Sequence, residues 1–514
     1  MKDKLSNISQ RTWVRIILIC ILMIIVAISI AGEKVAINRG IGWDGESYFT
    51  TMRSFISMIK HHGYDQYAIR RIMPWGLTNI ICAIVGINVT RNVAIASGVI
   101  YNVIALALSV FYFFRISNLK QWKIETEVIG FAFVFYSFLV LKMLGYYPIL
   151  SDVFGMTLGL MLCYYFFANK KWALIICGFL GATLWPSSPV CAFALAFFPR
   201  KELTYASQTE NKYNKYLLNG LYILIASLPV LFIIQGLIEY HGHIMLAMRA
   251  ICPLTIPVSE WIIPLSCLCS CLFYYYLVSA FKISLPQVIK ENFTGKSVWY
   301  NYVLFVVCIL SISVIGKILA NSNPGTLTPL LTIKWIVMTS MTDPFVFVEN
   351  YFVYYGLAYI LILIFWKDLA KIIMNQGLGY LFVVALWVLF SIRPEARVSI
   401  LYWIFPVMAL LMYIDTKNIR KSATGYAVIS SLIFSHFWFP FNVPNMEKYL
   451  AWENYANYTK FPAQRYFLNH GHWQSHEMYY VLTILTIIIG IVVYYGIKQK
   501  WFVRNVNQGY DSLA

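Results

Sequence analysis

Long apolar segments alternate with short polar ones along the whole chain. Val14–Ala31, Val93–Phe114 and Tyr479–Ile497 are each about as long as a helix must be to cross the hydrocarbon core of a bilayer. With the other apolar runs, the predicted spans lie near residues 14–31, 93–115, 127–144, 153–168, 172–184, 187–198, 217–236, 262–281, 300–320, 351–366, 377–392, 398–414, 424–438 and 478–497. This pattern predicts an all-α fold, a polytopic transmembrane helical bundle of about 12–14 spans, in which residues 1–514 form a single integral membrane domain.

Composition supports this prediction, because 60% of the residues are hydrophobic and only 12% are charged. Soluble proteins are roughly 45–50% apolar and about 25% charged, so the soluble class is excluded. The mean hydropathy of +0.66 agrees. The ten cysteines lie in or beside apolar segments and form no CxxC pair, which favours buried thiols over a disulfide framework or a metal site.

The net charge of +18 is distributed as the orientation of a membrane protein requires. With the N-terminus inside, most of the 40 Lys and Arg residues fall in cytoplasmic segments, and the C-terminus is cytoplasmic too. Segment 72–88 is apolar but broken by Pro74, and we place it outside as an interfacial helix, since counting it as a span would turn the basic loops outward. The basic excess is therefore an orientation signal, and no nucleic-acid partner is expected. Short loops and abundant Lys and Ile favour a bacterial cell membrane.

Function is expected on the outer face, because the polar groups there are not needed for orientation. The large outer segments are 32–92, 239–261, 321–350 and 439–477, with a short loop at Arg393–Arg397. The cytoplasmic loops contain neither a P-loop nor a GxGxxG motif, which disfavours a nucleotide-driven pump. The last outer loop, 439–477, has many aromatic residues and few charges, and it can either stack on sugar rings or lie on the membrane surface.

The first outer loop, 32–92, carries the most specific chemistry. It contains Gly42–Tyr48 (GWDGESY), an acidic pair two residues apart on a glycine-rich backbone. The stretch Tyr48–His62 then places apolar residues on one helical face, as amphipathic helices at a membrane surface do. A carboxylate here could deprotonate an acceptor hydroxyl or hold a metal, and nearby arginines could bind a phosphate. The alternative is that Asp44 only caps the helix and Glu46 stabilises its first turn.

The order of these elements resembles the GT-C superfamily of membrane glycosyltransferases, which use polyprenyl-phosphate-linked sugars on the outer face. The motif Gly42–Tyr48 resembles the acidic first-loop motif of that superfamily, and Arg70–Pro74 (RRIMP) resembles its basic-proline segment. The turn Tyr147–Asp152 matches the second acidic loop, and Arg393–Arg397 (RPEAR) is similar to the arginine-bearing entry to a late helix. The chain departs from the oligosaccharyltransferases in having neither their large C-terminal soluble domain nor their WWD-type motif.

This resemblance implies a transferase that moves a sugar from a polyprenyl-phosphate-linked donor to a glycan, lipid or protein acceptor outside the membrane. Asp44 would be the general base and Glu46 its helper, while Asp152 would stand at the second acidic loop. The residues implied for binding the lipid phosphate are Arg70, Arg71, Arg393 and Arg397. No cofactor is required, although a divalent metal could bind if the three carboxylates converge.

Two other classes of function remain open from the sequence. A transporter, flippase or polymerase of lipid-linked polysaccharide would place charged residues within the spans, whereas a membrane scaffold would need no outer carboxylate. Two lysines, Lys142 and Lys317, lie inside predicted spans, and the outer acids and arginines outnumber them, which favours surface chemistry. His472 and His476 have the spacing of a zinc pair but lack the HExxH glutamate, which favours interfacial hydrogen bonding.

Overall fold

The computed structural model describes residues 2–35, 37–42, 44–205, 212–251, 260–323, 328–442, 476–499 and 501. Within these ranges every regular element is a helix, and the one β contact is an isolated bridge between Tyr205 and Ile283. The elements are α1 (Lys2–Ala31), η1 (Ile37–Gly40), α2 (Asp44–Lys60), η2 (Ala68–Arg71), α3 (Trp75–Val85), α4 (Arg91–Lys120), α5 (Ile124–Phe135), η3 (Leu139–Met143), α6 (Leu144–Tyr146), α7 (Asp152–Phe167), α8 (Lys171–Gly181), α9 (Ser188–Phe197), α10 (Lys212–Ala226), α11 (Leu228–Glu239), α12 (Ile244–Ile251), α13 (Ile262–Val278), α14 (Leu285–Asn292), α15 (Lys296–Leu319), α16 (Pro329–Thr339), α17 (Val346–Tyr355), α18 (Leu357–Ile364), α19 (Trp366–Met374), α20 (Leu378–Phe390), η4 (Ala396–Ser399), α21 (Ile400–Asp415), α22 (Lys421–Phe434) and α23 (His476–Lys498). The all-α prediction is confirmed.

Several helices are long and apolar enough to cross a membrane, as expected of a membrane protein. Among the described residues these are Gln10–Ala31, Arg91–Lys120, Lys296–Leu319, Ala396–Asp415 and Met478–Lys498, five in all. Two bent pairs, α5 with η3–α6 and α10 with α11, turn by 48° and raise the number to seven if each pair is one span. The sequence predicted 12–14 spans because hydropathy counts apolar residues, whereas the chain breaks many of these runs into helices of 10–17 residues.

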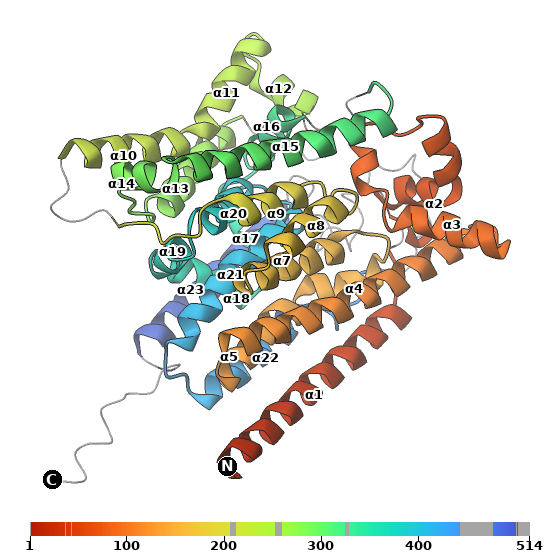
Figure 1. Ribbon diagram of the computed structural model, residues 1–514, viewed down its shortest axis with the longest axis horizontal. Helices are drawn as coiled ribbons and strands as arrows, with labels where there is room; N and C mark the ends of the chain where they lie inside the picture. The colour runs from red at the N-terminus through yellow and green to blue at the C-terminus, as the bar shows by residue number, and fades with distance from the viewer. Residues whose placement is uncertain are drawn as a thin grey trace.

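A central helix and its neighbours form the core, and the longest apolar helices lie around them (Figure 1). Of the most apolar 18 residues in the span Ala396–Asp415, which contains α21, 78% are buried inside the protein. The corresponding share is 22% in α1 and 0% in α15. The α21 side chains Trp403, Phe405 and Leu410 are fully or almost fully buried. The outer helices instead expose apolar side chains, as helices in contact with lipid do.

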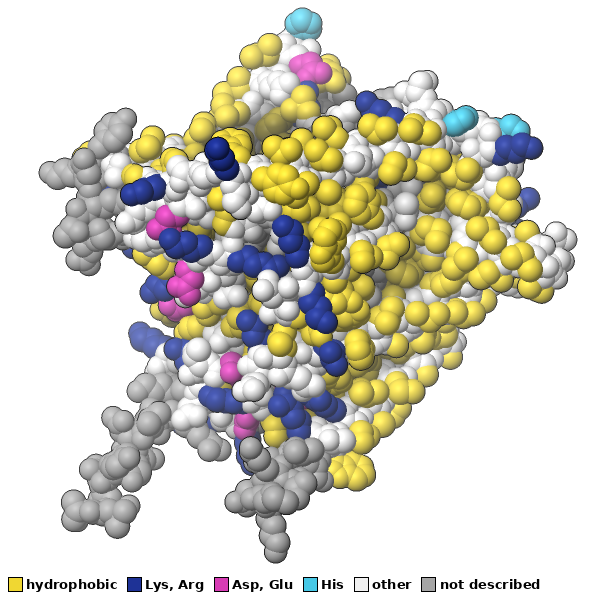
Figure 2. Space-filling model, viewed as in Figure 1, with side chains coloured by type: hydrophobic (Ala, Val, Ile, Leu, Met, Phe, Trp, Pro, Cys, Tyr) yellow, Lys and Arg dark blue, Asp and Glu magenta, His cyan; other side chains and the backbone are white. Residues whose placement is uncertain are grey.

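Charged side chains are unevenly distributed over the surface. Figure 2 shows Lys and Arg gathered on the left and lower left of that view, where the N-terminal end of α1 lies, and hydrophobic side chains over the right. The separation resembles a lipid-facing band beside a basic face, which is the pattern that orients a membrane protein.

The first outer loop folds into helices that pack on one another. Segment 72–88 forms α3, which has 11 residues and is too short to span a bilayer by itself. It packs against α2, and the Trp75 ring stacks on Tyr48 with centroids 5.3 Å apart. Gly76 permits this packing, because a Cβ there would lie 2.7 Å from the Phe55 ring.

A buried carboxylate fastens α1 to the start of α5. Glu127 is fully buried, and it accepts hydrogen bonds from Arg15 at 2.7 Å, from Arg11 at 2.5 Å and from Ser117. Two guanidiniums therefore neutralise one carboxylate at the end of the bundle where α1 begins. Removal of a charged partner from such a site is costly because the remaining charges stay partly buried without compensation.

We expect Glu127→Ala to lower the free energy of unfolding by about 3 kcal/mol, since it leaves Arg11 and Arg15 without their counter-charge. Thermal unfolding in detergent measures the change. The matched control is Glu125→Ala, which removes a carboxylate from the same helical turn but leaves the Glu127 pairs intact. Equal destabilisation by the two variants would contradict this account of the contact.

Candidate active site

Arg397 gathers three carboxylates just before α21. Its guanidinium lies 3.0 Å from the Asp44 carboxylate, 3.4 Å from Asp152 and 2.6 Å from Glu395. Arg393 forms an ion pair with the other carboxylate oxygen of Glu395. We refer to these five residues as the acid–arginine cluster. It joins parts of the chain that are 353 and 245 residues apart, counted from Arg397 to Asp44 and to Asp152.

The carboxylates of the cluster differ in their exposure to solvent. The side chains of Asp152 and Glu395 are 5% and 10% exposed, whereas that of Asp44 is 46% exposed. Asp152 stands in the turn that precedes the apolar run of α7. Burial, with smaller contributions from the charges of Glu395 and Asp44, raises its pKa to about 6, against the opposing effects of Arg397 and Arg71. Asp44 is therefore the acid that an incoming molecule can reach.

The backbone before α2 places Asp44 in the cluster. Gly42 has φ +76°, and a Cβ at this position would overlap the Tyr147 ring. The side-chain amide of Asn38 donates to the Gly42 carbonyl at 2.9 Å, and the Gly45 N–H donates to the Tyr147 hydroxyl at 3.4 Å. Asp44 is also the first residue of α2, where the helix dipole favours a negative charge. The capping alternative and the cluster position are thus compatible.

The turn before α7 places Asp152 opposite Asp44. The Asn102 side chain donates to the Pro148 carbonyl at 2.8 Å, in a buried hydrogen bond. Gly98 lets this turn lie against α4, because a Cβ there would be 2.6 Å from the same carbonyl. Helices α4 and α7 also pack along each other, so α4 positions both the turn and the helix that follows it.

The central helix holds Arg397 rigidly. The residue belongs to η4, the 3₁₀ turn that leads into α21. The Tyr355 hydroxyl donates to the Ala396 carbonyl at 2.9 Å, and the Tyr355 ring stacks on Trp403 with centroids 4.2 Å apart. A fully packed aromatic core therefore supports the residue that collects the carboxylates.

Arg71 approaches the same region from η2. Its Nη1 donates to the Tyr48 hydroxyl at 3.2 Å, and its guanidinium lies over the rings of Tyr67 and Trp185, 4.9 and 5.8 Å from their centroids. Tyr48 lies one helical turn after Asp44 on α2, which links Arg71 to the cluster. No carboxylate within ion-pair distance of Arg71 is found in the described part of the chain.

Two of the predicted site residues lie elsewhere. Glu46 faces Arg91 at 3.8 Å and makes no ion pair with Arg397, so the acidic pair of the first loop is split. The Arg70 side chain makes no hydrogen bond or ion pair to any described residue. The structure thus brings together four of the predicted site residues, Asp44, Asp152, Arg393 and Arg397. Arg71 lies next to this group, whereas Glu46 and Arg70 make no contact with it.

A buried ion pair ties together the segments that lead to Asp44 and Asp152. Lys142 Nζ donates to Glu33 at 2.8 Å, and its side chain is 7% exposed. Glu33 also accepts from the backbone N–H groups of residues 441–442, at 2.5 and 2.7 Å. Glu33 leads into the first outer loop and Lys142 leads into the turn before α7. The pair therefore limits how far these two segments can separate.

The three carboxylates that could hold a metal if they converged do not converge in this arrangement. Asp44 and Asp152 both face the Arg397 guanidinium, and Glu46 points to Arg91. No group of three or more His, Cys, Asp or Glu residues suited to a metal occurs within the described ranges. We therefore derive no step through a metal. His472 lies outside the described residues, as does almost all of the last outer loop, 439–477, beyond residue 442.

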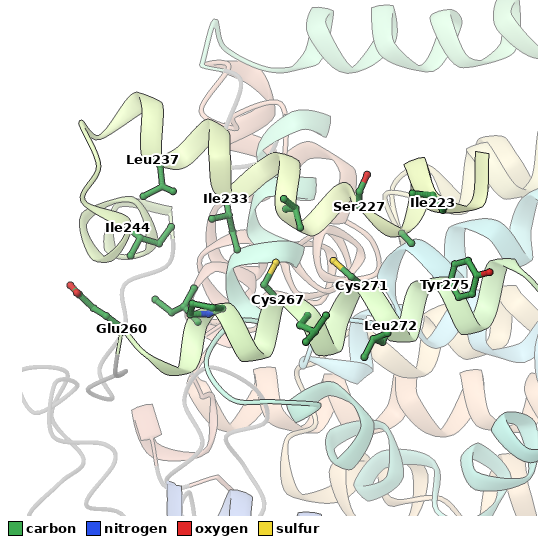
Figure 3. Close-up of a pocket in the computed structure, with 15 residues that line it drawn as sticks. Ile223, Ser227, Ile233, Leu237, Ile244, Glu260, Cys267, Cys271, Leu272 and Tyr275 are labelled. Carbon is green, nitrogen blue, oxygen red and sulfur yellow. The ribbon is translucent and has the colours of Figure 1, made fainter. Parts of the chain in front are cut away.

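A separate apolar cavity of about 630 Å³ lies between α10–α11 and α13 (Figure 3). Its lining is almost entirely hydrophobic, with Cys267 and Cys271 on α13 and Glu260 at one end. None of the acid–arginine cluster lines this cavity. The cavity offers apolar surface but no paired acid and base, so the cluster remains the candidate active site.

Sequence reasoning missed the roles of four contributors to the site. Glu395 stands within the RPEAR motif but was given no role, although a carboxylate between two arginines is itself a signal of ion pairing. Tyr48 and Tyr147 stand within the quoted motifs, but their hydrogen bonds to Arg71 and to the Gly45 N–H appear only in the tertiary structure. The Lys142–Glu33 pair needs the tertiary structure, since Glu33 follows α1 whereas Lys142 lies in η3, far along the chain.

No protein-family model matches this chain, and neither a curated protein nor a solved structure matches it. Function must therefore be argued from the residues and their geometry. The geometry offers one partly exposed carboxylate, Asp44, and a buried one, Asp152, both paired with Arg397, which shares Glu395 with Arg393.

We expect Gly42→Ala to disrupt the cluster for two reasons. The alanine would have to adopt a left-handed backbone conformation, and its Cβ would clash with the Tyr147 ring. The matched control is Gly86→Ala, since Gly86 also has φ +76° but no atom within 4 Å of its Cβ position. Backbone strain alone costs about 1–2 kcal/mol. Thermal unfolding should show a larger loss for Gly42→Ala than for the control. Equal losses would mean that Tyr147 moves away freely.

The raised pKa of Asp152 predicts how stability depends on pH. In the folded protein this carboxyl keeps its proton up to about pH 6, so between its normal pKa and that value the folded state binds more protons than the unfolded state. The stability of the wild type relative to Asp152→Asn should therefore fall as pH rises from 4 to about 6, and level off above. Thermal unfolding of both proteins across this pH range measures the difference in their stability. A difference that does not change with pH would contradict the assignment.

Proposed function

We propose that this chain is a membrane glycosyltransferase of the GT-C type. It would move a sugar from a polyprenyl-phosphate-linked donor to an acceptor glycan, lipid or protein at the outer face of the membrane. The observation that carries the proposal is the contact of Arg397 with Asp44 and Asp152, beside Arg393 and at one end of an apolar helical bundle. A carboxylate base and a phosphate-binding arginine are the two groups that such a transfer needs.

Asp44 acts as the general base in this proposal. Its carboxylate takes the proton of the acceptor hydroxyl, whose oxygen attacks the anomeric carbon of the donor. The bond from that carbon to the phosphate oxygen breaks, and the polyprenyl phosphate leaves with the electron pair. Its 46% exposed side chain supports this role, because a hydroxyl must come within hydrogen-bond distance of the base.

The arginines stabilise the negative charge of the leaving phosphate. A guanidinium is always ionised and presents several N–H donors in one plane, which suits phosphate oxygens. Asp152 and Glu395 are too buried to serve as the base, and they hold Arg397 in place instead. The N- and C-termini would be cytoplasmic and the site external, as the distribution of basic residues favours.

A transporter, flippase or polymerase of lipid-linked polysaccharide is the second candidate. The buried Lys142–Glu33 pair favours it, because ionised groups inside an apolar bundle commonly mark a transport path. The pair also bonds to the backbone of residues 441–442, which gives it a structural role that needs no transported substrate.

Asp44→Asn is expected to lower sugar transfer at least about 100-fold, since a general base contributes that much or more. The assay measures transfer of labelled sugar from polyprenyl-phosphate donors in proteoliposomes. Asp65→Asn is the control, because it removes a carboxylate from the same loop while its side-chain oxygen can still accept from the N–H groups of Tyr67 and Ala68.

Full transfer by folded Asp44→Asn would remove Asp44 as the base. A wild type that transfers no sugar from a broad donor panel, yet moves lipid-linked glycans across the bilayer, would replace the transferase proposal with the transporter.

A further inference from the structure

Glu33 and Lys142 lie at a point where three segments of the chain meet. The Glu33 carboxylate accepts from Lys142 Nζ at 2.8 Å. It also accepts from the backbone N–H groups of Phe441 and Asn442, at 2.5 and 2.7 Å. Lys142 Nζ in turn donates to the Phe439 carbonyl at 2.7 Å and lies 4.4 Å from the centroid of the Phe441 ring. We call this contact between Glu33, Lys142 and residues 439–442 the clasp.

Neutral hydrogen bonds reinforce the clasp beside the ion pair. The Asn442 side-chain amide donates to the Lys34 carbonyl at 2.8 Å and accepts from the Tyr146 hydroxyl at 3.0 Å. The Val35 N–H donates to the Tyr146 carbonyl at 2.8 Å. The segment that leads toward Asp44 and the segment that leads toward Asp152 are therefore held together at several neighbouring points.

A short stretch of helix joins Lys142 to Tyr147. Lys142 lies in η3, α6 follows η3 directly, and the Tyr147 N–H donates to the Met143 carbonyl at 2.8 Å. Because backbone hydrogen bonds link successive turns of a helix, the position of Lys142 determines that of Tyr147. The clasp therefore fixes Tyr147 from the side opposite the acid–arginine cluster in the order of the chain.

Tyr147 in turn determines where the backbone on either side of Asp44 can lie. A Cβ at Gly42 would be 2.1 Å from the Cζ atom of Tyr147, and the Gly45 N–H donates to the Tyr147 hydroxyl at 3.4 Å. Both contacts fall within two residues of Asp44. Since Arg397 meets the Asp44 carboxylate at 3.0 Å, a shift of Tyr147 would move this carboxylate relative to the guanidinium.

An ion pair suits this task better than apolar packing does. Apolar side chains pack against lipid and protein almost equally well, so they do not fix how far one segment slides past another. The side chains of Lys142 and Glu33 are only 7% and 21% exposed, and each charge would be costly without its partner. Sliding of either segment would separate the two charges, and the clasp therefore keeps both segments in one register.

We propose that Glu33 and Lys142 are positioning residues for the transfer reaction, because their ion pair holds Tyr147 against the start of α2 and so keeps Asp44 beside Arg397. Neither is a catalytic residue in this assignment, and Asp44 remains the base. The inference rests on the proposed function and gives a role in it to two residues outside the acid–arginine cluster.

The first test compares kcat with KM in the sugar-transfer assay. Lys142→Met and Glu33→Gln should each lower kcat about tenfold or more and keep KM for the polyprenyl-phosphate donor within about twofold, because a misplaced base slows the chemical step without removing a contact to the donor. Lys34→Met is the matched control, since Lys34 adjoins Glu33 but its Nζ donates to the Ile30 and Gly32 carbonyls of its own segment. It should keep kcat within about twofold of the wild type.

Hydrogen exchange tests the same linkage without a transfer assay. The Gly45 N–H donates to the Tyr147 hydroxyl, so its exchange rate reports whether that contact persists. In the full chain in nanodiscs, at a temperature where the variants are folded, Lys142→Met should speed the exchange of this amide about tenfold. Lys34→Met should leave the exchange rate of the Gly45 amide unchanged.

A double variant separates positioning from stability. Glu33→Gln with Lys142→Met removes both charges, so it leaves neither of them buried without a partner, and it replaces any single variant that fails to fold. The double variant should be more stable in thermal unfolding than either single variant, yet its kcat should stay about tenfold or more below the wild type. A kcat that recovers together with the stability would mean that the pair only stabilises the fold, and the positioning role would be wrong.

The remaining outcomes separate the two proposals. If the wild type transfers sugar and the folded Lys142→Met and Glu33→Gln variants keep its kcat, the proposed function stands and the positioning role is overturned. The positioning role is also overturned if these variants raise KM in place of lowering kcat, or if Lys34→Met causes the same losses. If Lys142→Met speeds exchange at Gly45 but the wild type transfers no sugar, the clasp holds the start of α2 as inferred and the proposed function fails.

Discussion

A guanidinium that contacts three carboxylates in a mostly dry site determines how the outer part of this protein is arranged. Charges removed from water are tolerated only when opposite charges and hydrogen bonds replace the lost hydration. Arg397 meets that condition through Asp44, Asp152 and Glu395, which bring the first outer loop, the second turn and the late helix to one point. Displacing any one of these segments would leave a charge without its partner. The site and the packing of the loops therefore depend on the same contact.

Buried ion pairs also fasten α1 at both ends of the bundle. At one end Glu127 pairs with Arg11 and Arg15, and at the other Glu33, just beyond α1, pairs with Lys142. Between them α1 makes mainly apolar contacts, together with hydrogen bonds from the Tyr136 hydroxyl to the Leu18 carbonyl at 2.9 Å and from the Ser29 hydroxyl to the Lys142 carbonyl at 3.2 Å. This distribution suits a helix in lipid, because apolar side chains pack against lipid and protein almost equally well and cannot by themselves fix its position. The charged contacts supply the specificity that apolar packing lacks.

The cluster combines buried groups with one carboxylate that solvent can reach, and this combination suits a catalytic role. Arg397 and Asp152 lie at the starts of the buried helices α21 and α7, whereas Asp44 begins α2 and its side chain is 46% exposed. An exposed carboxylate held by one contact to a fixed arginine is oriented and still reachable. Catalytic groups need both properties, since a small error in placement lowers the rate strongly.

The sequence by itself determined the class of fold and much of the candidate site. Its apolar runs predicted helices throughout, because a chain in lipid must satisfy its backbone hydrogen bonds internally. The resemblance of its short motifs to those of the GT-C superfamily also singled out Asp44, Asp152, Arg71, Arg393 and Arg397. Tertiary structure alone decided where helices break, as at Gly356 (φ +56°) between α17 and α18, which hydropathy cannot detect. It also decided that Glu46 turns to Arg91 and Arg70 stays apart, because partner choice depends on the distance between segments that are far apart in the chain.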